Sequence, residues 1–421
     1  MTGGGAAPER RRRGPDSRLI VLMITAFMDM VGLLMVIPLL PFYALDLGAS
    51  AFMVTLLVAS YSVAQLLSAP LWGRFSDRYG RRPALLVGLV ASAIAYVVFA
   101  YADSLWLLFA SRVVQGAGGG TVGVIQAYVA DATRPEDRAK SLGWLSAATN
   151  LGVAIGPVLG SQTLHFGRPA PGLIAAAFCV VNIAFAARYL TESHDVAGAR
   201  SAPKAPRRSL EALSRVLSHP ADAASRLIMI YAVAIGAFMG ANAVLALFLE
   251  QRFAVTAQTI GYFFTYIGVL SVLTRALVLG RMVDHFGEVR LSRIGTVLLA
   301  TGLIALPFTT DYVTLALAVA LLPLGTAFTF PCVTAMLSRV IPSHERGLYM
   351  GVQQTFGGIT RSVFPALFGL AFEVGAGVPF WIGGTLVAGT LLLGMGLGRH
   401  ASETPTDEHA RAPERASASR R

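Results

Sequence analysis

The sequence has little charge and almost no cysteine for its length. Only 14% of its 421 residues are Asp, Glu, Lys or Arg, and its two cysteines, Cys179 and Cys332, lie inside long apolar runs. Two such cysteines exclude a disulfide framework and do not indicate a reactive thiol site. The sequence also lacks the H-E-x-x-H, G-x-S-x-G and G-x-x-x-x-G-K patterns of zinc proteases, serine hydrolases and phosphate-binding loops. We therefore expect no enzyme, no metal site and no cofactor.

Apolar residues are abundant: they make up 55% of the chain and give it a mean hydropathy of +0.62. A helix of about 20 apolar residues spans the hydrocarbon layer of a membrane. The chain divides into segments of about this length, which predicts an all-α integral membrane protein. The twelve segments are Leu19–Leu40, Ala51–Trp72, Ala84–Ala102, Leu105–Val129, Leu142–Thr163, Leu173–Leu190, Leu227–Leu249, Ile260–Leu279, Ser292–Phe308, Val313–Leu337, Leu348–Ala371 and Pro379–Leu397.

The basic residues predict how these helices are oriented. The N-terminal stretch "PERRRRGPDSR" could begin a secretory signal, but no small-residue cleavage site follows, so we expect a retained first helix. Most Lys and Arg residues lie at the two chain ends, in the stretch 191–226 and in the loops after segments two, four, eight and ten. The loops on the other side carry only Arg168 and Arg252, so the positive-inside rule predicts cytoplasmic termini. Topology, and not nucleic-acid binding, then explains the net charge of +11.

Recurring residues divide the chain into two similar halves. Gly73, Asp77 and Gly80 recur 207 residues later as Gly280, Asp284 and Gly287, while Arg138, Gly143 and Pro157 recur 208 residues later as Arg346, Gly351 and Pro365. This pattern indicates a tandem repeat of a six-helix unit. We expect a basic N-terminus at 1–18, helical halves at 19–190 and 227–397, a cytoplasmic linker at 191–226 and a cytoplasmic tail at 398–421. The linker is polar, with a short amphipathic helix predicted around Leu210–Leu217.

Four ionisable residues stand out inside the predicted spans: Asp29, Arg112, Arg275 and Arg361. Such residues are costly in hydrocarbon and mark ion or substrate pathways. None of the four recurs at the equivalent position of the other half, as expected for a site formed between two pseudo-symmetric halves. Asp29 lies about ten residues into its helix, near mid-membrane and deeper than any other acid. We predict that Asp29 carries the coupled proton and that it can pair with Arg112.

Polar and aromatic side chains at similar depth complete the predicted substrate cavity. Its members are Tyr61, Gln65, Gln115, Asn150, Asn242, Tyr266, Arg275, Gln353, Gln354 and Arg361. For each polar side chain a hydrogen bond between helices is an equal alternative, and Arg112 could simply tie helices together through backbone carbonyls. Three buried arginines against one buried acid suit an anionic or zwitterionic substrate better than a simple cation.

The turn after the second segment, "WGRFSDRYGRRPALL", is unusually charged for so hydrophobic a chain. Its glycines allow a tight connection, and Asp77 lies near the end of the preceding helix. A carboxylate there could meet the positive N-terminal end of another helix, or a neighbouring arginine such as Arg81. The alternative is a solvated basic loop that only obeys the positive-inside rule. The copy of Asp77 at Asp284 favours a specific contact.

The fifth segment contains glycines at a spacing of four. Gly152, Gly156 and Gly160 therefore share one helix face, where a neighbouring backbone can approach closely. Pro157 removes a helix hydrogen bond beside them. We predict a bendable, tightly packed seam between the halves, against the eighth helix. The alternative is ordinary packing of small residues.

Several of these motifs resemble a known family. "GRFSDRYGRRP" and "RVVQGAGGG" resemble the loop and fourth-helix signatures of the major facilitator superfamily, while "GVAIGPVLG" and "DMVGLLMVIPLLP" are similar to patterns of its proton-coupled drug antiporters. "YVADATRPEDRAKSLG" and "VLGRMVDHFGE" resemble the tetracycline/proton antiporters in particular. The resemblance covers residues 19–397. A G-x-G-x-x-G match at Gly118–Gly123 lies inside an apolar helix, and we interpret it as packing.

The resemblance implies the fold and a mechanism of alternating access. It implies twelve helices in two pseudo-symmetric halves in a bacterial inner membrane, with lipid around a functional monomer and the proton gradient as the driving force. It also implies a conformational latch made of Gly73, Asp77, Arg81, Asp131, Gly280 and Asp284. In the latch Asp77 meets the start of helix eleven near Gly347 when the cytoplasmic side is closed, and Asp131 joins through Arg81.

One departure from the resemblance limits the substrate prediction. Tetracycline antiporters carry an acid in the ninth helix, whereas "LSRIGTVLLATGLIALPF" has none. We expect proton-coupled efflux of a small amphipathic or drug-like organic molecule. The alternatives are uptake or exchange of an organic anion or zwitterionic metabolite, and a sensor or receptor that binds without transport.

Overall fold

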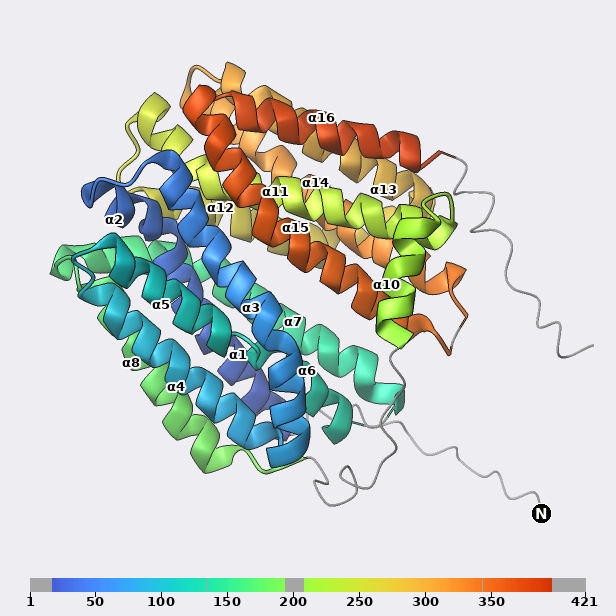
Figure 1. Ribbon diagram of the computed structural model, residues 1–421, viewed down its shortest axis with the longest axis horizontal. Helices are drawn as coiled ribbons and strands as arrows, with labels where there is room; N and C mark the ends of the chain where they lie inside the picture. Colours follow the sequence, from blue (N-terminus) through green and yellow to red (C-terminus); the bar gives the residue numbers. More distant parts are fainter. Residues whose placement is uncertain (1–16, 134, 194–207, 343, 396–421) are drawn as a thin grey trace, which may run out of the picture.

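The computed structural model describes residues 17–133, 135–193, 208–342 and 344–395 (Figure 1). These residues form helices and no strands. Three expected parts of the chain lie outside the described residues: almost all of the basic N-terminus, the central part of the linker and the whole C-terminal tail. In Figure 1 the earlier helices form one bundle and the later helices form a second bundle beside it.

The first bundle consists of ten helical segments. They are α1 (Ser17–Val36), η1 (Ile37–Leu39), α2 (Leu40–Asp46), α3 (Ala51–Tyr79), α4 (Arg81–Ala100), α5 (Leu105–Gly118), α6 (Thr121–Ala132), α7 (Pro135–Thr163), η2 (Leu164–Phe166) and α8 (Ala170–Tyr189). The second bundle follows α10 (Arg208–Ser218), an amphipathic helix that confirms the one predicted in the linker. It contains α11 (Ala223–Phe253), α12 (Ile260–Leu273), η3 (Thr274–Val278), α13 (Leu279–Ala305), η4 (Leu306–Phe308), α14 (Tyr312–Val340), α15 (Arg346–Val374) and α16 (Val378–Leu393).

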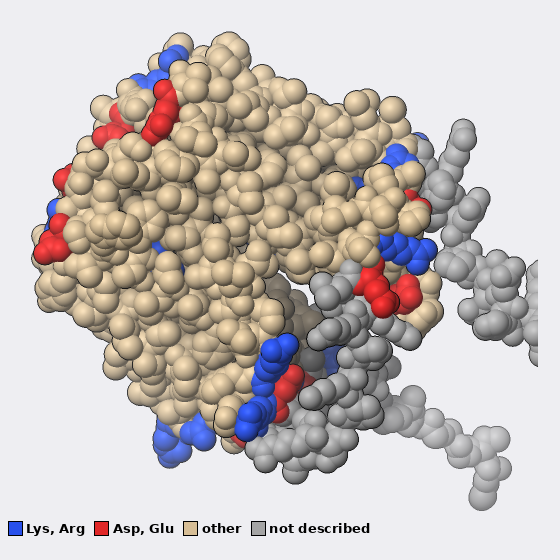
Figure 2. All heavy atoms as spheres, in the orientation of Figure 1, with Lys and Arg blue, Asp and Glu red and all other residues tan. Residues whose placement is uncertain are grey.

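The predicted twelve passes are confirmed. Nine described ranges are long and apolar enough to cross a membrane. One of them, Ile260–Phe308, is 49 residues long and contains two passes, because the chain turns at Gly287, where φ is 70°. The interrupted pair α5–α6 and the shorter helix α16 supply the other two. Figure 2 shows charged side chains gathered toward the ends of the bundles and a broad uncharged surface between them, as a membrane-embedded chain requires.

Two of the passes are not regular α-helices: a glycine-rich turn divides the fourth pass, and a π-helix lies within the eighth. The predicted helix Leu105–Val129 is divided: α5 ends at Gly118, and α6 begins at Thr121. The Trp72 ring occupies the space that a Cβ on Gly120 would need, so the turn is closely packed, in agreement with the packing interpretation of this glycine-rich stretch. The eighth pass contains the five-residue π-helix η3, a feature that is frequent at functional sites.

The two bundles touch at one end and separate at the other. We call these the α2 end and the α10 end, after the short helices that mark them (Figure 1). α3 packs on α15 and α7 packs on α12, in both cases through residues near the α2 end. The Phe52 amide donates to Glu373 Oε1 at 3.1 Å, and the Gly261 amide donates to Ser161 Oγ at 3.0 Å.

The apolar core has the same asymmetry. Near the α2 end a single cluster contains residues of both bundles, including Leu57, Phe248 and Phe368. Toward the α10 end the core divides into separate clusters that do not cross between the bundles: one in the first bundle, represented by Tyr128, and two in the second, represented by Leu337 and Phe328. Figure 2 shows a recess between the bundles on this side. The molecule is therefore closed at the α2 end and open at the α10 end.

Candidate functional site

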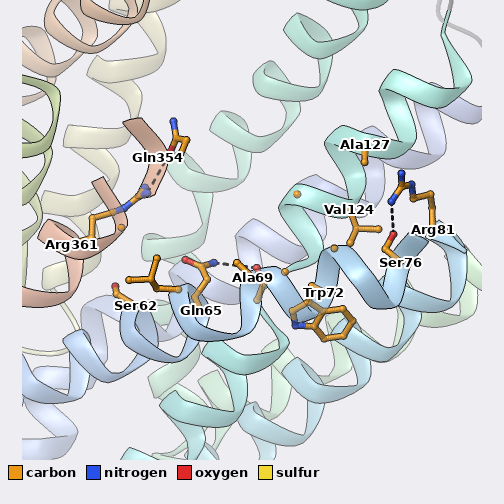
Figure 3. Close-up of a pocket in the computed structure, with 16 residues that line it drawn as sticks. Ser62, Gln65, Ala69, Trp72, Ser76, Arg81, Val124, Ala127, Gln354 and Arg361 are labelled. Carbon is orange, nitrogen blue, oxygen red and sulfur yellow. Dashed lines mark hydrogen bonds between the residues drawn. The ribbon is translucent and has the colours of Figure 1, made fainter. Parts of the chain in front are cut away.

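A cavity of about 390 Å³ lies between the two bundles. Residues of α3 and α6 and the turn before α6 line one side, and residues of α15 line the other (Figure 3). Its polar and charged lining residues are Ser62, Gln65, Ser76, Arg81, Gln354 and Arg361, and the rest are apolar or small, apart from the indole of Trp72. The cavity extends along α3 toward the α10 end, where the bundles separate.

Three of the predicted cavity residues line this cavity. Arg361 is half-buried on α15, where its Nε donates to the Gly357 carbonyl at 3.1 Å and its Nη2 donates to Gln354 Oε1 at 3.5 Å. Across the cavity, Gln65 Nε2 donates to the Tyr61 hydroxyl at 3.2 Å and to the Gly119 carbonyl at 3.1 Å. Side chains from both bundles therefore face the same space, as Figure 3 shows.

Asp29 lies behind the cavity wall, at the interruption between α5 and α6. Its side chain is only 7% exposed, and its Oδ2 accepts a hydrogen bond from Thr121 Oγ1 at 3.1 Å. Thr121 is the first residue of α6, so the carboxylate lies near the positive N-terminal end of a half-helix. The interruption of the fourth pass thus positions the only deeply buried acid among the described residues.

Arg112 is fully buried, and the predicted ion pair with Asp29 is absent in this conformation. Asp29 accepts from Thr121 instead, and Nε and Nη2 of Arg112 have no hydrogen-bond partner among the described residues. The Tyr61 hydroxyl lies within electrostatic range of Asp29, Arg112 and Arg361. Because the same hydroxyl accepts from the cavity residue Gln65, Tyr61 connects the cavity lining with the surroundings of these buried charges.

The other predicted cavity residues do not line this cavity. Gln115 and Gln353 are buried, and each has one side-chain atom without a partner among the described residues. Asn150 and Asn242 donate to carbonyls of their own helices, which is neither a cavity contact nor the hydrogen bond between helices that was the alternative. Tyr266 donates to the carbonyl of Ala316 on α14.

Arg275 also lies outside the cavity, within the π-helix η3. Its Nε is buried without a hydrogen-bond partner in the described part of the chain. A π-helix widens the turn and leaves a carbonyl without its usual partner, so η3 places this arginine where regular helix would not. No feature of the sequence indicated the π-helix.

The charged turn between α3 and α4 forms a network inside the first bundle. Arg81 Nη1 contacts Asp77 Oδ1 at 2.7 Å, and Arg81 Nε contacts Asp131 Oδ2 at 3.0 Å. The Asp77 side chain is 61% exposed, and a Cβ on Gly347 at the start of α15 would meet no atom within 4 Å. The predicted contact with helix eleven is therefore not made here, in agreement with the open α10 end. Gly73 and Gly280 likewise have open space beside them.

Glu192 is a functional candidate that the sequence did not reveal. Its two carboxylate oxygens accept from the backbone amides of Arg81 at 2.9 Å and Arg82 at 3.0 Å, so it caps the N-terminus of α4. Gly80, with φ 105°, has no side chain where Glu192 lies. Arg82 Nη2 also donates to the Ala187 carbonyl at 2.5 Å. These contacts fasten the charged turn to the end of α8.

The second bundle contains a related ion pair with its charges exchanged. Glu288 and Arg339 form it, with Oε1 and Nη2 2.7 Å apart. Glu288 lies 207 residues after Arg81, and Arg339 lies 208 residues after Asp131, which are the two offsets of the repeat. Both halves therefore have an ion pair at these equivalent positions, but the arginine and the acid have changed places. The predicted latch member Asp284 forms no ion pair among the described residues.

The glycine seam of α7 faces a different helix from the one predicted. A Cβ on Gly152 would lie 2.8 Å from the Phe27 carbonyl oxygen, and one on Gly156 would lie 2.8 Å from the Cβ of Leu34. A Cβ on Gly160 would come closer still to the Met35 carbonyl oxygen. These neighbours all belong to the first pass, so the glycines pack within one bundle and not against α12. α12 instead contacts a neighbouring face, where the Pro157 carbonyl and Ser161 approach Gly261.

Twelve passes in two bundles, with a cavity of mixed polar and apolar lining between the bundles, define the architecture of a membrane transporter of small molecules. Comparison with known sequences places the chain within this class. The profile of the Major Facilitator Superfamily matches residues 22–276 and 227–420. The chain belongs to this superfamily, whose members are transporters and not enzymes.

Its curated relatives include drug-resistance proteins. Tetracycline resistance protein, class C, of Escherichia coli is 30% identical over 381 residues, covering 90% of this chain and 94% of the relative. Multidrug resistance protein 2 of Bacillus subtilis (strain 168) is 26% identical over 384 residues, covering 90% of this chain and 93% of the relative. The resemblance to the drug/proton antiporter branch is thus confirmed.

Solved structures share the fold. The human organic anion transporter MFSD10 (TETRAN) superimposes with a TM-score of 0.68 at 24% identity, covering 92% of this chain and 100% of that chain. A POT family transporter in complex with 5-aminolevulinic acid gives a TM-score of 0.77 at 14% identity, covering 94% of this chain and 99% of that chain. At these identities the likeness shows the fold alone.

Proposed function

We propose that the chain exports small amphipathic organic molecules from the cytoplasm in exchange for protons. Relatives named for tetracycline and multidrug resistance support export of drug-like molecules. The observation that carries the proton-coupled part is the buried Asp29 carboxyl, held by Thr121 behind a cavity between the two bundles. We further propose a functional monomer in a bacterial inner membrane, with both termini and α10 in the cytoplasm.

In this proposal the structure is the cytoplasm-open state of an alternating-access cycle. Substrate enters from the α10 end and occupies the cavity beside Gln65 and Arg361. The bundles then close at the α10 end, where Asp77 can reach the start of α15, and separate at the α2 end, where Glu373 releases the Phe52 amide. Each ligand shifts this equilibrium only by its difference in affinity for the two states.

Asp29 couples the two fluxes by taking up a proton from one side and releasing it to the other. Its contact with Thr121 in this state, and an ion pair with Arg112 in another state, would give the carboxyl two environments. Tyr61 is hydrogen-bonded to the cavity residue Gln65 and lies within electrostatic range of Asp29, so substrate arrival can be sensed at the buried acid. Outward substrate movement and inward proton movement then alternate at one site.

The test is transport by purified protein in liposomes under an imposed pH gradient, with labelled amphipathic cations, zwitterions and organic anions. Wild-type protein should concentrate substrate against its gradient when only a pH difference is imposed. Asp29→Asn should abolish this uphill movement and leave downhill exchange partly intact. Asp103→Asn, which removes an exposed carboxyl, is the matched control and should behave as wild type. Uphill transport by Asp29→Asn would show that another group carries the proton.

A second candidate function is uptake or exchange of an organic anion. Arg112, Arg275 and Arg361 favour it, because none of the three forms an ion pair among the described residues. It predicts movement of labelled anions in both directions without a requirement for a pH gradient, so the same liposome experiment separates it from proton-driven export.

A further inference from the structure

The cavity has a positive charge that no acid balances. Its lining contains two charged side chains, Arg81 and Arg361, and no carboxylate. The charge of Arg81 is matched by Asp77 and Asp131, at 2.7 and 3.0 Å. Arg361 makes no ion pair within the described part of the chain. Its hydrogen bonds go to neutral oxygens only, the Gly357 carbonyl and the Gln354 amide.

The donors of Arg361 are only partly used. A guanidinium group has five N–H donors arranged as a planar fork, and two of its nitrogens account for the hydrogen bonds described here. The side chain lines the cavity, so the remaining donors are available to a molecule inside it (Figure 3). Such a fork matches the two oxygens of a carboxylate, whereas a cationic group would be repelled.

The residues around Arg361 strengthen the preference of the cavity for an anionic group. Arg112, within electrostatic range of the Tyr61 hydroxyl, adds a second buried positive charge whose Nε and Nη2 have no partner among the described residues. The opposite side of the cavity offers Leu66 and the ring of Trp72, which suit an apolar or aromatic body. The cavity thus combines an anion-binding end with an apolar wall.

We propose that the transported molecule carries a carboxylate or similar oxyanion, that Arg361 binds it through a bidentate pair of hydrogen bonds, and that its apolar body lies along Leu66 and Trp72. This inference rests on the proposed export function and adds the charge class of the substrate. It also assigns Arg361 as the residue that determines specificity. Gln354 positions the guanidinium by accepting from its Nη2.

The experiment uses two dyes that share one body and differ in a single group. Rhodamine B has a free carboxylate, and its ethyl ester does not. Fluorescence anisotropy with the protein in nanodiscs, corrected with empty nanodiscs, gives the affinity of each dye. The wild-type protein should bind rhodamine B roughly tenfold or more tightly than the ester, because a charge-assisted hydrogen-bond pair is lost in the ester.

Substitutions at Arg361 assign the preference to this side chain. Arg361→Met should make the two affinities equal, and Arg361→Lys should keep part of the preference, since it retains the charge but loses the fork. Arg290→Met, which removes an exposed arginine of α13, is the matched control and should keep the full preference. The comparison of the two dyes on the wild-type protein stays decisive even where a variant does not fold.

The outcomes separate this inference from the proposed function. Equal binding of both dyes to the wild-type protein, or an unchanged preference in Arg361→Met, overturns the carboxylate inference. Uphill transport of the ester under a pH gradient would then still support proton-coupled export. Conversely, a clear carboxylate preference without pH-driven flux of either dye would support the binding inference and overturn the export function.

Discussion

The closed α2 end allows a test of alternating access, because one glycine determines how closely the two bundles approach there. A Cβ on Gly369 of α15 would lie 3.0 Å from the Cα of Phe52 and 3.0 Å from the Cβ of Thr55, and closer still to the Thr55 hydroxyl. These atoms belong to α3, in the other bundle. Backbone atoms cannot rotate away, so Gly369→Ala requires the helices to separate.

The expected size of the effect follows from this crowding. Overfilling a packed contact costs about 1–3 kcal/mol. Under alternating access the contact exists only while the α2 end is closed, so the cost falls on that state alone. The ratio of outward-open to cytoplasm-open molecules should therefore rise about 5- to 150-fold.

The control is Gly351→Ala on the same helix, where a Cβ would meet no atom within 4 Å. Both changes replace a helical glycine by alanine, so their effects on helix propensity cancel in the comparison. Spin labels at Asp103 and Gln251, one in each bundle near the α2 end, report the separation by electron-spin distance measurements. Gly369→Ala should lengthen the distances and Gly351→Ala should not. Identical distance distributions for both variants would refute the reasoning.

Three further predictions concern the charged turn, the topology and a helix cap. Asp77→Asn should shift the equilibrium toward the cytoplasm-open state, so transport falls while substrate still binds; a wild-type transport rate under a saturating gradient would leave the turn as a topological anchor only. Single cysteines at Ser201 and Ala418 should be protected from an impermeant thiol reagent in intact cells and one at Gly167 should be labelled; the reverse pattern would invert the proposed orientation. Hydrogen bonds from the Thr314 amide and hydroxyl and from the Val313 amide hold the pKa of Asp311 below its usual range. This contribution to stability is present above the unfolded-state pKa and is lost as pH falls through the folded-state pKa. The unfolding midpoint should therefore drop less between about pH 5 and about pH 3 in Asp311→Ala than in the wild-type protein.

The fold could be predicted almost completely from the sequence, because a membrane requires long apolar helices and the two halves repeat. The interruptions were harder to predict. Nothing in the run Leu105–Val129 shows that Trp72, from another helix, fills the space beside Gly120. The π-helix η3 depends on hydrogen-bond spacing, which residue types do not specify.

The candidate site was predicted in part. Charges are rare in apolar helices, so the sequence alone drew attention to Asp29, Arg112 and Arg361. The structure buries the first two and places the third in the cavity lining, while their roles stay predictions. Spacing shows which residues share a helix face, but not what lies opposite. For that reason the sequence placed the glycine seam against the wrong helix and gave no sign of Glu192, whose role depends on the distant start of α4.

The length of α3 has a consequence for the medium in which the latch works. Its 29 residues extend over about 44 Å, whereas the hydrocarbon layer is about 30 Å thick. Charged side chains gather at the Asp77 end, so most of the excess length projects into water there. Dissolved salt screens charges over about 8 Å at physiological ionic strength. If Asp77 meets the start of α15 on the cytoplasmic side, as we propose, this contact forms in electrolyte. Ionic strength inside the cell, unlike that outside, should then alter how often the transporter turns outward.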